Sequence, residues 1–251
     1  MKKEESMDIP GRGLIDPIDL SKELRAKRVE LANDHLTGDK RTGMQSGVPL
    51  DVEWLKLASS SYDLSPEIKD YMMVPVVIFY ANIPNRNGVG FSIKDLASFV
   101  PEYGCPSYRT WRGKPVLYEH SDHDDVKTSK GVVLDSFLRK DRGHWKVLSY
   151  LAVDREKDTE LASRLMKNEV NTYSMGAYIT GGFFCSICEK EVGTCHHLDN
   201  RKPRAGMRLI DLGDRLPHVA FMVGKGPVGF EISVVESPAY PMAENSDIQF
   251  W

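Results

Sequence analysis

The chain has 251 residues, of which 41% are hydrophobic and 27% are charged, a composition typical of a soluble globular protein. Its formal net charge of -3 and its pI near 6.2 argue against a broad electrostatic surface for nucleic acid and leave room only for a local basic patch. The N-terminus lacks the apolar segment of a signal peptide, and Pro75 interrupts the longest apolar stretch well short of the roughly 20 residues that a membrane helix requires.

The first 70 residues are polar and interrupted, with one helical pattern at 19–34. We interpret residues 1–70 as an N-terminal arm, a candidate propeptide or targeting segment. The β-branched and aromatic run MMVPVVIFY follows, which predicts a strand and marks the start of a domain over 71–251. The segment SIKDLASFV then predicts a short helix with Ser92 as N-cap and Asp95 three residues later.

Strand patterns continue at 114–120, 130–138 and 144–153, separated by charged or glycine-containing turns, and they predict an antiparallel meander. A helix lying on the sheet is predicted within 154–169, where acidic residues come early and apolar residues recur at helical spacing, namely Leu161, Leu165 and Met166. Strand patterns return at 170–180 and in GFEISVVESPAYPMA. The sequence therefore predicts an α+β fold: a mostly antiparallel sheet or barrel flanked by helices.

Three polar residues lie in or at the ends of these strands. Ser174 shares one face of its strand with Thr172 and Gly176, while Tyr173, Met175, Ala177 and Ile179 share the other. A nucleophilic serine needs such clearance and a base nearby, which His120 at the end of its strand could supply. Glu231 faces away from Phe230, Ile232 and Val234, and could orient an imidazole. Taken alone, each residue is better explained as an ordinary side chain: Ser174 as a strand serine, His120 as a surface histidine and Glu231 as a solvated glutamate on an edge strand.

A small insertion at 181–206 concentrates metal-ligand residue types in CSICEKEVGTCHH. Cys185 and Cys188 form a Cys-x2-Cys pair, and Cys195 returns six residues later, which suits a zinc site better than a disulfide framework. We expect structural Zn²⁺ on these cysteines, with His197 or His196 as the fourth ligand; free thiols in a loop are the alternative. Such cysteine usage fits a reducing cytoplasm.

Taken in order, segments of the chain resemble the prohead maturation proteases of tailed phages, which are distant relatives of herpesvirus assemblin. The resemblance covers about 72–184 and 226–244. It consists of an NRN turn before a helix, a histidine at a strand end in LYEHSDHD, a serine in the S-x-G of NTYSMGAYI, and an acidic strand, GFEISVVESPAYPMA, ending in a P-A turn. It implies an assemblin-like fold and the activity of a serine endopeptidase.

By this resemblance Ser174 is the nucleophile, His120 the general base and Glu231 the third member of a triad, with His123 a rival for base or orienter. The implied reaction is hydrolysis of a peptide bond through an acyl-enzyme, without a catalytic cofactor. Some relatives place an arginine directly after the serine, whereas Met175 follows here. This departure leaves the donors of the oxyanion hole unassigned.

The resemblance further implies a self-processing homo-oligomer that cleaves scaffold, core and major capsid proteins inside a phage procapsid, in the cytoplasm of a bacterial host. The sequence MAE at 242–244 is similar to the glutamate-ended sites that the family cleaves. The alternative expectation is a non-catalytic zinc-binding core protein of the phage head with the same fold. A zinc-dependent nucleic-acid binder is a third, which the acidic balance of the chain disfavours.

Overall fold

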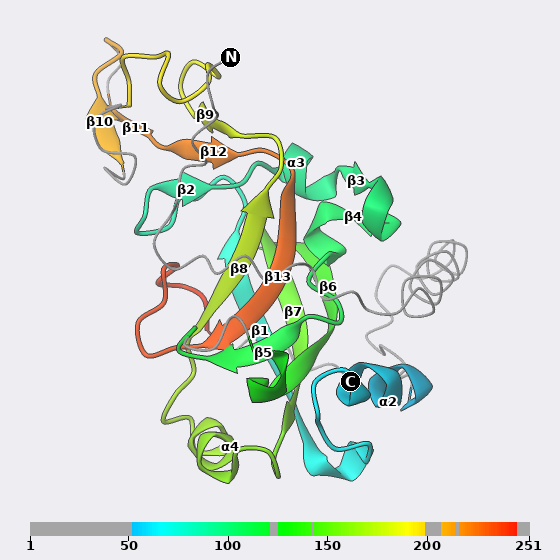
Figure 1. Cartoon of the computed structure of the whole chain (residues 1–251). Coiled ribbons are helices and arrows are strands. Elements are labelled where there is room, and N and C mark those ends of the chain that lie inside the picture. Colours follow the sequence, from blue (N-terminus) through cyan, green and yellow to red (C-terminus); the bar gives the residue numbers. More distant parts are fainter. Residues whose placement is uncertain (1–51, 121–124, 142, 199–206, 214–215, 245–251) are drawn as a thin grey trace.

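The computed structural model describes residues 52–244 except 121–124, 142, 199–206 and 214–215. This part of the chain is a mixed α+β structure, mostly strands with few helices around a curled sheet shaped like a half-barrel (Figure 1). The helices are α2 (Val52–Ser60), α3 (Ile93–Ala97) and α4 (Thr159–Met166), with 3-10 helices at Ile68–Asp70, Pro101–Tyr103, Ser107–Arg109 and Val126–Thr128. The strands are β1 (Tyr71–Tyr80), β2 (Val89–Gly90), β3 (Phe99–Val100), β4 (Cys105–Pro106), β5 (Pro115–Tyr118), β6 (Gly131–Asp141), β7 (His144–Asp154), β8 (Tyr173–Ile179), β9 (Phe183–Cys185), β10 (Arg208–Ile210), β11 (His218–Ala220), β12 (Met222–Gly224) and β13 (Pro227–Val234).

The main sheet has the strand order β1-β7-β6-β5-β13-β8. Strands β5, β6 and β7 are antiparallel neighbours, which confirms the predicted meander. The late strand β13 enters between the early strand β5 and the middle strand β8, parallel to the first and antiparallel to the second. This insertion brings segments that are far apart in the sequence onto adjacent strands.

The largest core cluster lies on one face of this sheet, with Phe79, Leu151 and Ile232 among its fully buried members. Helix α4 contributes Leu161 and Leu165 to the cluster, as the helical pattern predicts. Met166 does not follow this prediction, since its side chain is 62% exposed at the end of the helix. Asp158 caps the helix by accepting a hydrogen bond from the Leu161 amide at 2.9 Å. Helix α4 therefore begins at Thr159, in the middle of the predicted segment 154–169.

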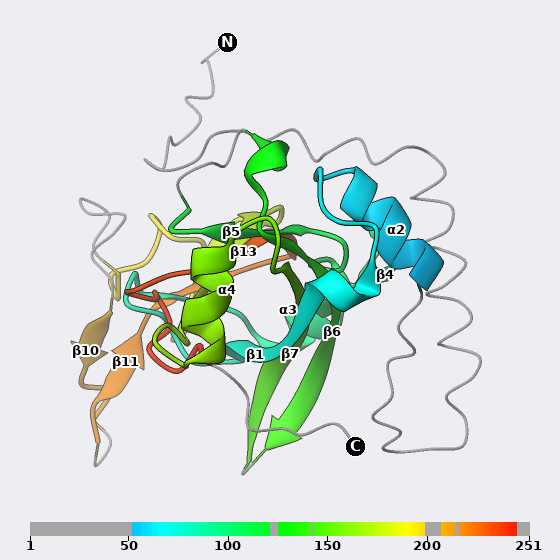
Figure 2. The ribbon, with the colours of Figure 1, turned by 90° about the horizontal axis from the view of Figure 1, so that it is seen from below.

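Helix α2 packs against a second cluster on the sheet, beside β6 (Figure 2). Leu55 and Tyr62 are fully buried there against Val132 and Leu134, and the Tyr62 hydroxyl donates to the Gly113 carbonyl at 2.8 Å. This differs from the expected domain boundary at residue 71, because the apolar residues that follow residue 54 belong to the packed body. The predicted helix at 19–34 lies outside the described residues.

Beyond the main sheet, β8 and β13 continue as a two-stranded ribbon into β9 and β12. Thr180 and Gly181 donate backbone hydrogen bonds to Gly226 and Lys225, and β9 then pairs with β12 up to Cys185 opposite Met222. The hairpin of β10 and β11 follows at the far end of this ribbon (Figure 1). The strands that carry Ser174 and Glu231 therefore also carry the cysteine-containing insertion.

Residues 240–244 close the sheet on its open side. The Val77 amide of β1 donates to the Glu244 carbonyl at 3.0 Å, and the Tyr173 amide of β8 donates to the Ala243 carbonyl at 2.9 Å. Ala243 is fully buried. This closing segment links the two edge strands of the sheet, so it contributes to the curled shape.

Candidate functional site

The pairing of β8 with β13 places the predicted nucleophile and the predicted acid on one face of the sheet. Ser174 lies directly opposite Ser233, and Glu231 lies directly opposite Gly176. Residues opposite each other in an antiparallel pair point to the same side, and so do residues two apart on one strand. Met175 of β8, on the other face, packs against the apolar core, which confirms the predicted alternation in β8.

A β-bulge changes the arrangement expected for β13. The register shifts between Gly229 and Glu231, so Phe230 lies outside the regular pairing. A Cβ atom added to Gly176 would lie 2.3 Å from the Phe230 ring and 2.6 Å from Glu231 Oε1. The expectation that Phe230 faces away from Glu231 is therefore wrong, because both side chains occupy the space above Gly176.

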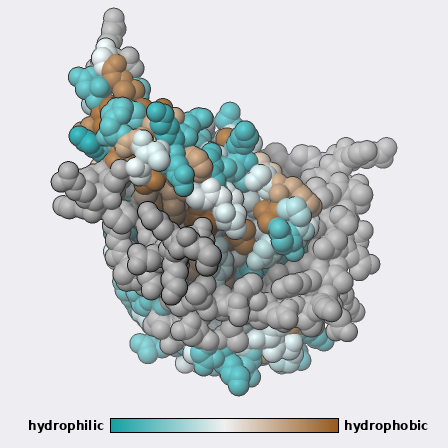
Figure 3. Space-filling model, turned by 45° about the horizontal axis from the view of Figure 1, so that its top comes forward, coloured by the Kyte–Doolittle hydropathy of each residue, from teal (hydrophilic) through white to brown (hydrophobic). Residues whose placement is uncertain are grey.

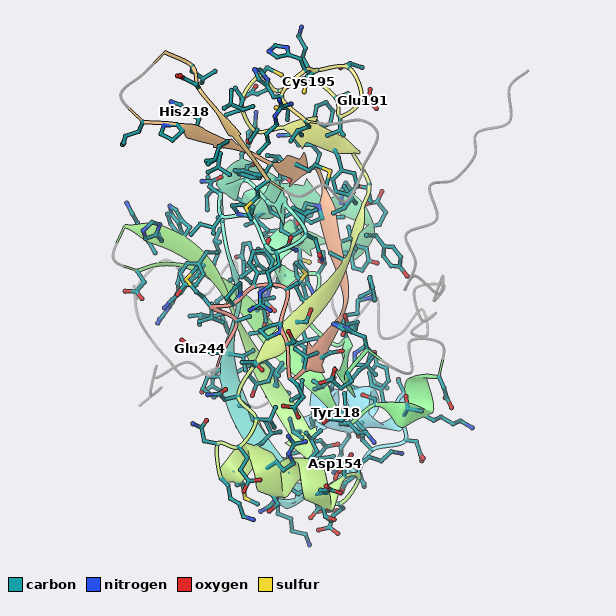
Figure 4. All side chains as sticks on the ribbon, turned by 90° about the vertical axis from the view of Figure 1, so that its left-hand side faces the viewer. Tyr118, Asp154, Glu191, Cys195, His218 and Glu244 are labelled. Atoms are coloured by element: carbon teal, nitrogen blue, oxygen red, sulfur yellow. The ribbon has the colours of Figure 1, made fainter. Side chains whose placement is uncertain are left out.

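His120 reaches this face through a tight turn after β5. Both Glu119 and His120 have φ near 54°, a left-handed conformation that is uncommon for residues other than glycine. The Glu119 amide donates to the Val234 carbonyl at 2.9 Å, and the Glu119 side chain accepts from the Glu236 amide at 2.6 Å. Figure 4 labels Tyr118, which ends β5 just before this turn. The turn is therefore fastened to the end of β13, the strand that carries Glu231.

The His120 imidazole contacts the Glu231 carboxylate, with 3.2 Å between Nδ1 and Oε1. Glu231 is almost completely buried, whereas the His120 side chain is 34% exposed. Burial lowers the pKa of His120, but the carboxylate of Glu231, with help from Glu119, outweighs this effect and raises it above its usual value. The structure thus brings a partly exposed imidazole and a buried carboxylate into contact, although Oε1 has no hydrogen-bond partner among the described residues.

Ser174 is half-buried on the same face, and among the described residues no hydrogen bond joins its hydroxyl to His120. His123 lies outside the described residues. Sequence reasoning missed Ser233, which is fully buried and donates from Oγ to Glu231 Oε2 at 2.6 Å. Its two-residue spacing from Glu231 on a strand was the signal that could have found it, because that spacing puts both side chains on one face.

A second cluster of functional groups lies at the far end of the ribbon. The ligand atoms of Cys185, Cys188, Cys195 and His197 all lie within 4.8 Å of one another, a group that could hold a metal ion. Cys185 Sγ and His197 Nδ1 are 3.7 Å apart, close to the separation of about 3.6 Å that tetrahedral zinc with ordinary bond lengths would give. His196 is exposed and lies outside the cluster, so of the two candidate histidines the geometry favours His197.

The local environment shifts the pKa values of the groups in this cluster in different directions. Burial raises the pKa of Cys195, but backbone amides of Leu198 and His197 together with the neighbouring thiols outweigh it, so that the pKa lies below its usual value. Burial keeps the pKa of Cys185 above its usual value and lowers that of His197, which favours the neutral imidazole that metals bind. Cys105 lies apart from the cluster and is buried.

The cluster lies at the base of a projecting arm formed by residues 207–213 and 216–220. One side of the arm packs on the Cys/His cluster through Ile210 and Ala220. The other side is apolar and exposed, and Figure 3 shows brown surface on this projection. Its exposed apolar residues are Met207, Leu209, Leu212, Leu216 and Val219.

Comparison with known protein families, curated proteins and solved structures finds no match to this chain. Within the part of the chain that the structure describes, no helix is long and apolar enough to cross a membrane. The functional interpretation therefore depends on the geometry of the two clusters.

Proposed function

We propose that the chain is a serine endopeptidase with an assemblin-like fold, similar to the prohead maturation proteases of tailed phages. Ser174 acts as nucleophile, His120 as general base and Glu231 as the residue that orients the base. The observation that supports this proposal most strongly is the 3.2 Å contact between His120 Nδ1 and the buried Glu231 Oε1, on the sheet face that also carries Ser174.

In the proposed reaction, Nδ1–H of His120 points to Glu231 and leaves Nε2 to remove the proton of the Ser174 hydroxyl. Oγ then attacks the carbonyl carbon of the scissile peptide bond, and Glu231 stabilises the imidazolium that forms. The imidazolium returns its proton to the leaving amine, which yields an acyl-enzyme. A water molecule, deprotonated by the same imidazole, hydrolyses the ester and restores the hydroxyl.

The proposed substrates are scaffold, core and major capsid proteins of a phage procapsid, with the enzyme acting as a homo-oligomer inside that particle in the host cytoplasm. The segment MAE at 242–244 supports self-processing as part of this proposal. The closing segment ends at Glu244, so a cut after this residue would leave the backbone hydrogen bonds of Ala243 and Glu244 with β8 and β1 in place.

The test combines reactivity with cleavage. A fluorophosphonate probe should label Ser174 of the purified chain, and intact mass should show cleavage of scaffold and capsid proteins encoded in the same genome. Ser174→Ala should abolish both results, whereas Ser60→Ala, which removes an exposed hydroxyl on α2, should change neither. A folded oligomer that is neither labelled nor able to cleave its own or another chain contradicts the proposal.

We also propose that Cys185, Cys188, Cys195 and His197 hold a structural zinc ion. Three thiols and an imidazole leave no open coordination position, so this ion would fold the insertion and take no part in catalysis. The apolar cluster around Cys185 and Cys195 is small, with Leu198 and Ala220 as its other buried members, which explains why a metal would be needed to fix the arm.

Metal content of two neighbouring variants tests this assignment. His197→Ala should lose about one equivalent of zinc and lower the stability of the arm, because it removes a ligand. His196→Ala is the matched control, since His196 is exposed and outside the cluster, and it should retain the metal. Equal loss from both variants, or a purified wild-type chain that binds no zinc, contradicts the assignment.

The second candidate function is that of a non-catalytic zinc-binding core protein of the phage head. Two observations favour it: the missing hydrogen bond between Ser174 and His120 among the described residues, and the exposed apolar side of the arm. This candidate predicts no probe labelling at Ser174 and loss of procapsid assembly when Leu209 and Leu216 are replaced by serine. The protease proposal predicts labelling that these two substitutions leave intact.

A further inference from the structure

We propose that Ser233 is a positioning residue, whose hydroxyl fixes the carboxylate of Glu231 so that this carboxylate can hold His120. The inference rests on the proposed function and adds a residue that never meets substrate. Ser233 is fully buried on β13, two residues after Glu231 and directly opposite Ser174 of β8. Its hydroxyl donates to the carboxylate of Glu231, and it is through this carboxylate that it would act on His120.

The two oxygens of the buried carboxylate have one partner each. Oε2 accepts the Ser233 hydroxyl at 2.6 Å, and Oε1 lies 3.2 Å from His120 Nδ1. The contact with His120 is an ion-pair distance without hydrogen-bond geometry, so Oε1 has no hydrogen-bond partner among the described residues. A carboxylate taken out of water is costly unless its oxygens accept hydrogen bonds. The terminal torsion of a glutamate is otherwise broad, so the hydroxyl of Ser233 also sets which oxygen faces the imidazole.

The orientation of Glu231 determines the state of His120. A fixed Oε1 favours the tautomer with Nδ1–H and leaves Nε2 available as base. Among the described residues, the charged groups acting on His120 are Glu231 from β13 and Glu119 from its own turn. Without the Ser233 hydroxyl, Oε2 would be buried without a donor, and the carboxylate would be free to rotate. Its hold on His120 would then weaken.

Three variants separate the effect of the Ser233 hydroxyl from a general loss of stability. Ser233→Ala removes the donor, and Ser233→Thr keeps a hydroxyl at the same position. Ser136→Ala is the matched control, because Ser136 is also fully buried in the sheet and loses a comparable hydrogen bond, to Ser149 Oγ at 2.7 Å on the neighbouring strand. Urea unfolding of each variant reports whether it folds.

The first measurement is a pH titration of the ¹⁵N-labelled full chain by NMR, in which His120 is assigned with the variant His120→Gln. Ser233→Ala should lower the pKa of His120 and reduce the population of the tautomer with Nδ1–H, whereas Ser136→Ala should change neither. The second measurement is the rate of fluorophosphonate labelling. This rate should fall by roughly tenfold in Ser233→Ala, which corresponds to the loss of about one buried hydrogen bond. The acid limb of its pH profile should move to lower pH.

Ser233→Thr should restore the wild-type pKa of His120. If this variant does not fold, the titration of Ser233→Ala is sufficient to test the inference. The inference is overturned if Ser233→Ala leaves the pKa and tautomer of His120 unchanged, or shifts them no more than Ser136→Ala does. The NMR measurement needs no proteolysis. An unreactive Ser174 in the wild-type chain would therefore reject the proposed function without deciding whether Ser233 positions the carboxylate.

Discussion

At the residue scale, Gly176 leaves the space that Glu231 and Phe230 occupy. A methyl group at this position would lie 2.6 Å from Glu231 Oε1 and closer still to the Phe230 ring, well inside van der Waals contact. Glu231 lies on β13, between β5 and β8, and its side chain is almost fully buried. The smallest residue of the strand therefore permits the contact between Glu231 and His120.

We predict that Gly176→Ala lowers the free energy of unfolding by about 1–3 kcal/mol, the usual cost of overpacking, and slows labelling of Ser174 by displacing Glu231. Urea unfolding and probe kinetics check the two effects. Gly143→Ala is the control: its Cβ meets open space in the turn between β6 and β7, and its φ of +89° costs only backbone strain. An unchanged labelling rate in Gly176→Ala would show that the carboxylate position does not matter.

The contact with Glu231 also makes the activity pH-dependent. A general base must be neutral, so labelling of Ser174 should rise with pH through the raised pKa of His120. Stabilisation of the fold by this pair is present when His120 is protonated and is lost as pH rises through the same pKa. Glu231→Gln should lower that pKa, move the acid limb of the rate profile to lower pH and reduce the plateau. A profile that does not move contradicts the assigned pair.

At the element scale, α2 is part of the packed domain. Its buried residues cover the face of the sheet on which Val132, Leu134 and Ala152 lie, opposite the main core. Figure 2 shows the helix alongside that part of the sheet. Without α2 these strand residues would be exposed to water, which would remove apolar burial from β6 and β7.

We predict that Leu55→Ala lowers the free energy of unfolding by about 2–5 kcal/mol, because it leaves a cavity at a fully buried site. Lys56→Ala is exposed on the same helix and should change stability by less than about 0.5 kcal/mol. Chemical unfolding of both variants provides the measurement. Similar stability of the two would show that α2 does not pack on the sheet in solution.

At the scale of the whole molecule, the closing segment joins the ends of the curled sheet. A chain that ends at Glu244 keeps the backbone hydrogen bonds of Ala243 and Glu244 to β8 and β1. A chain that ends at residue 239 loses these bonds and the buried side chains of Tyr240 and Ala243, so it should melt several degrees lower and expose two strand edges. Calorimetry compares the two, and equal melting temperatures would contradict this role.

The local sequence was sufficient to predict features that depend only on residues a few positions apart in the chain. Alternation in β8, the Ser92 cap of α3 and the meander at 114–154 are confirmed, because periodicity and turn residues act over a few positions. The spacing of Cys185, Cys188 and Cys195 is likewise a local feature, and it indicates the group of possible metal ligands that these residues form with His197. The sequence did not reveal that residues 52–70 pack on the domain, because the strands that α2 covers lie far along the chain.

Only the tertiary structure decided which distant residues meet. The insertion of β13 between β5 and β8 brings Glu231 to His120 across more than one hundred residues of sequence, and a bulge then moves Phe230 to the same side. The choice of His197 over His196 likewise depends on the folded arrangement of the insertion, which brings His197 to the three cysteines. Sequence periodicity specifies which way a side chain points along its own strand. It carries no information on which strand lies beside it, because that choice is made by burial and hydrogen bonding over the whole sheet.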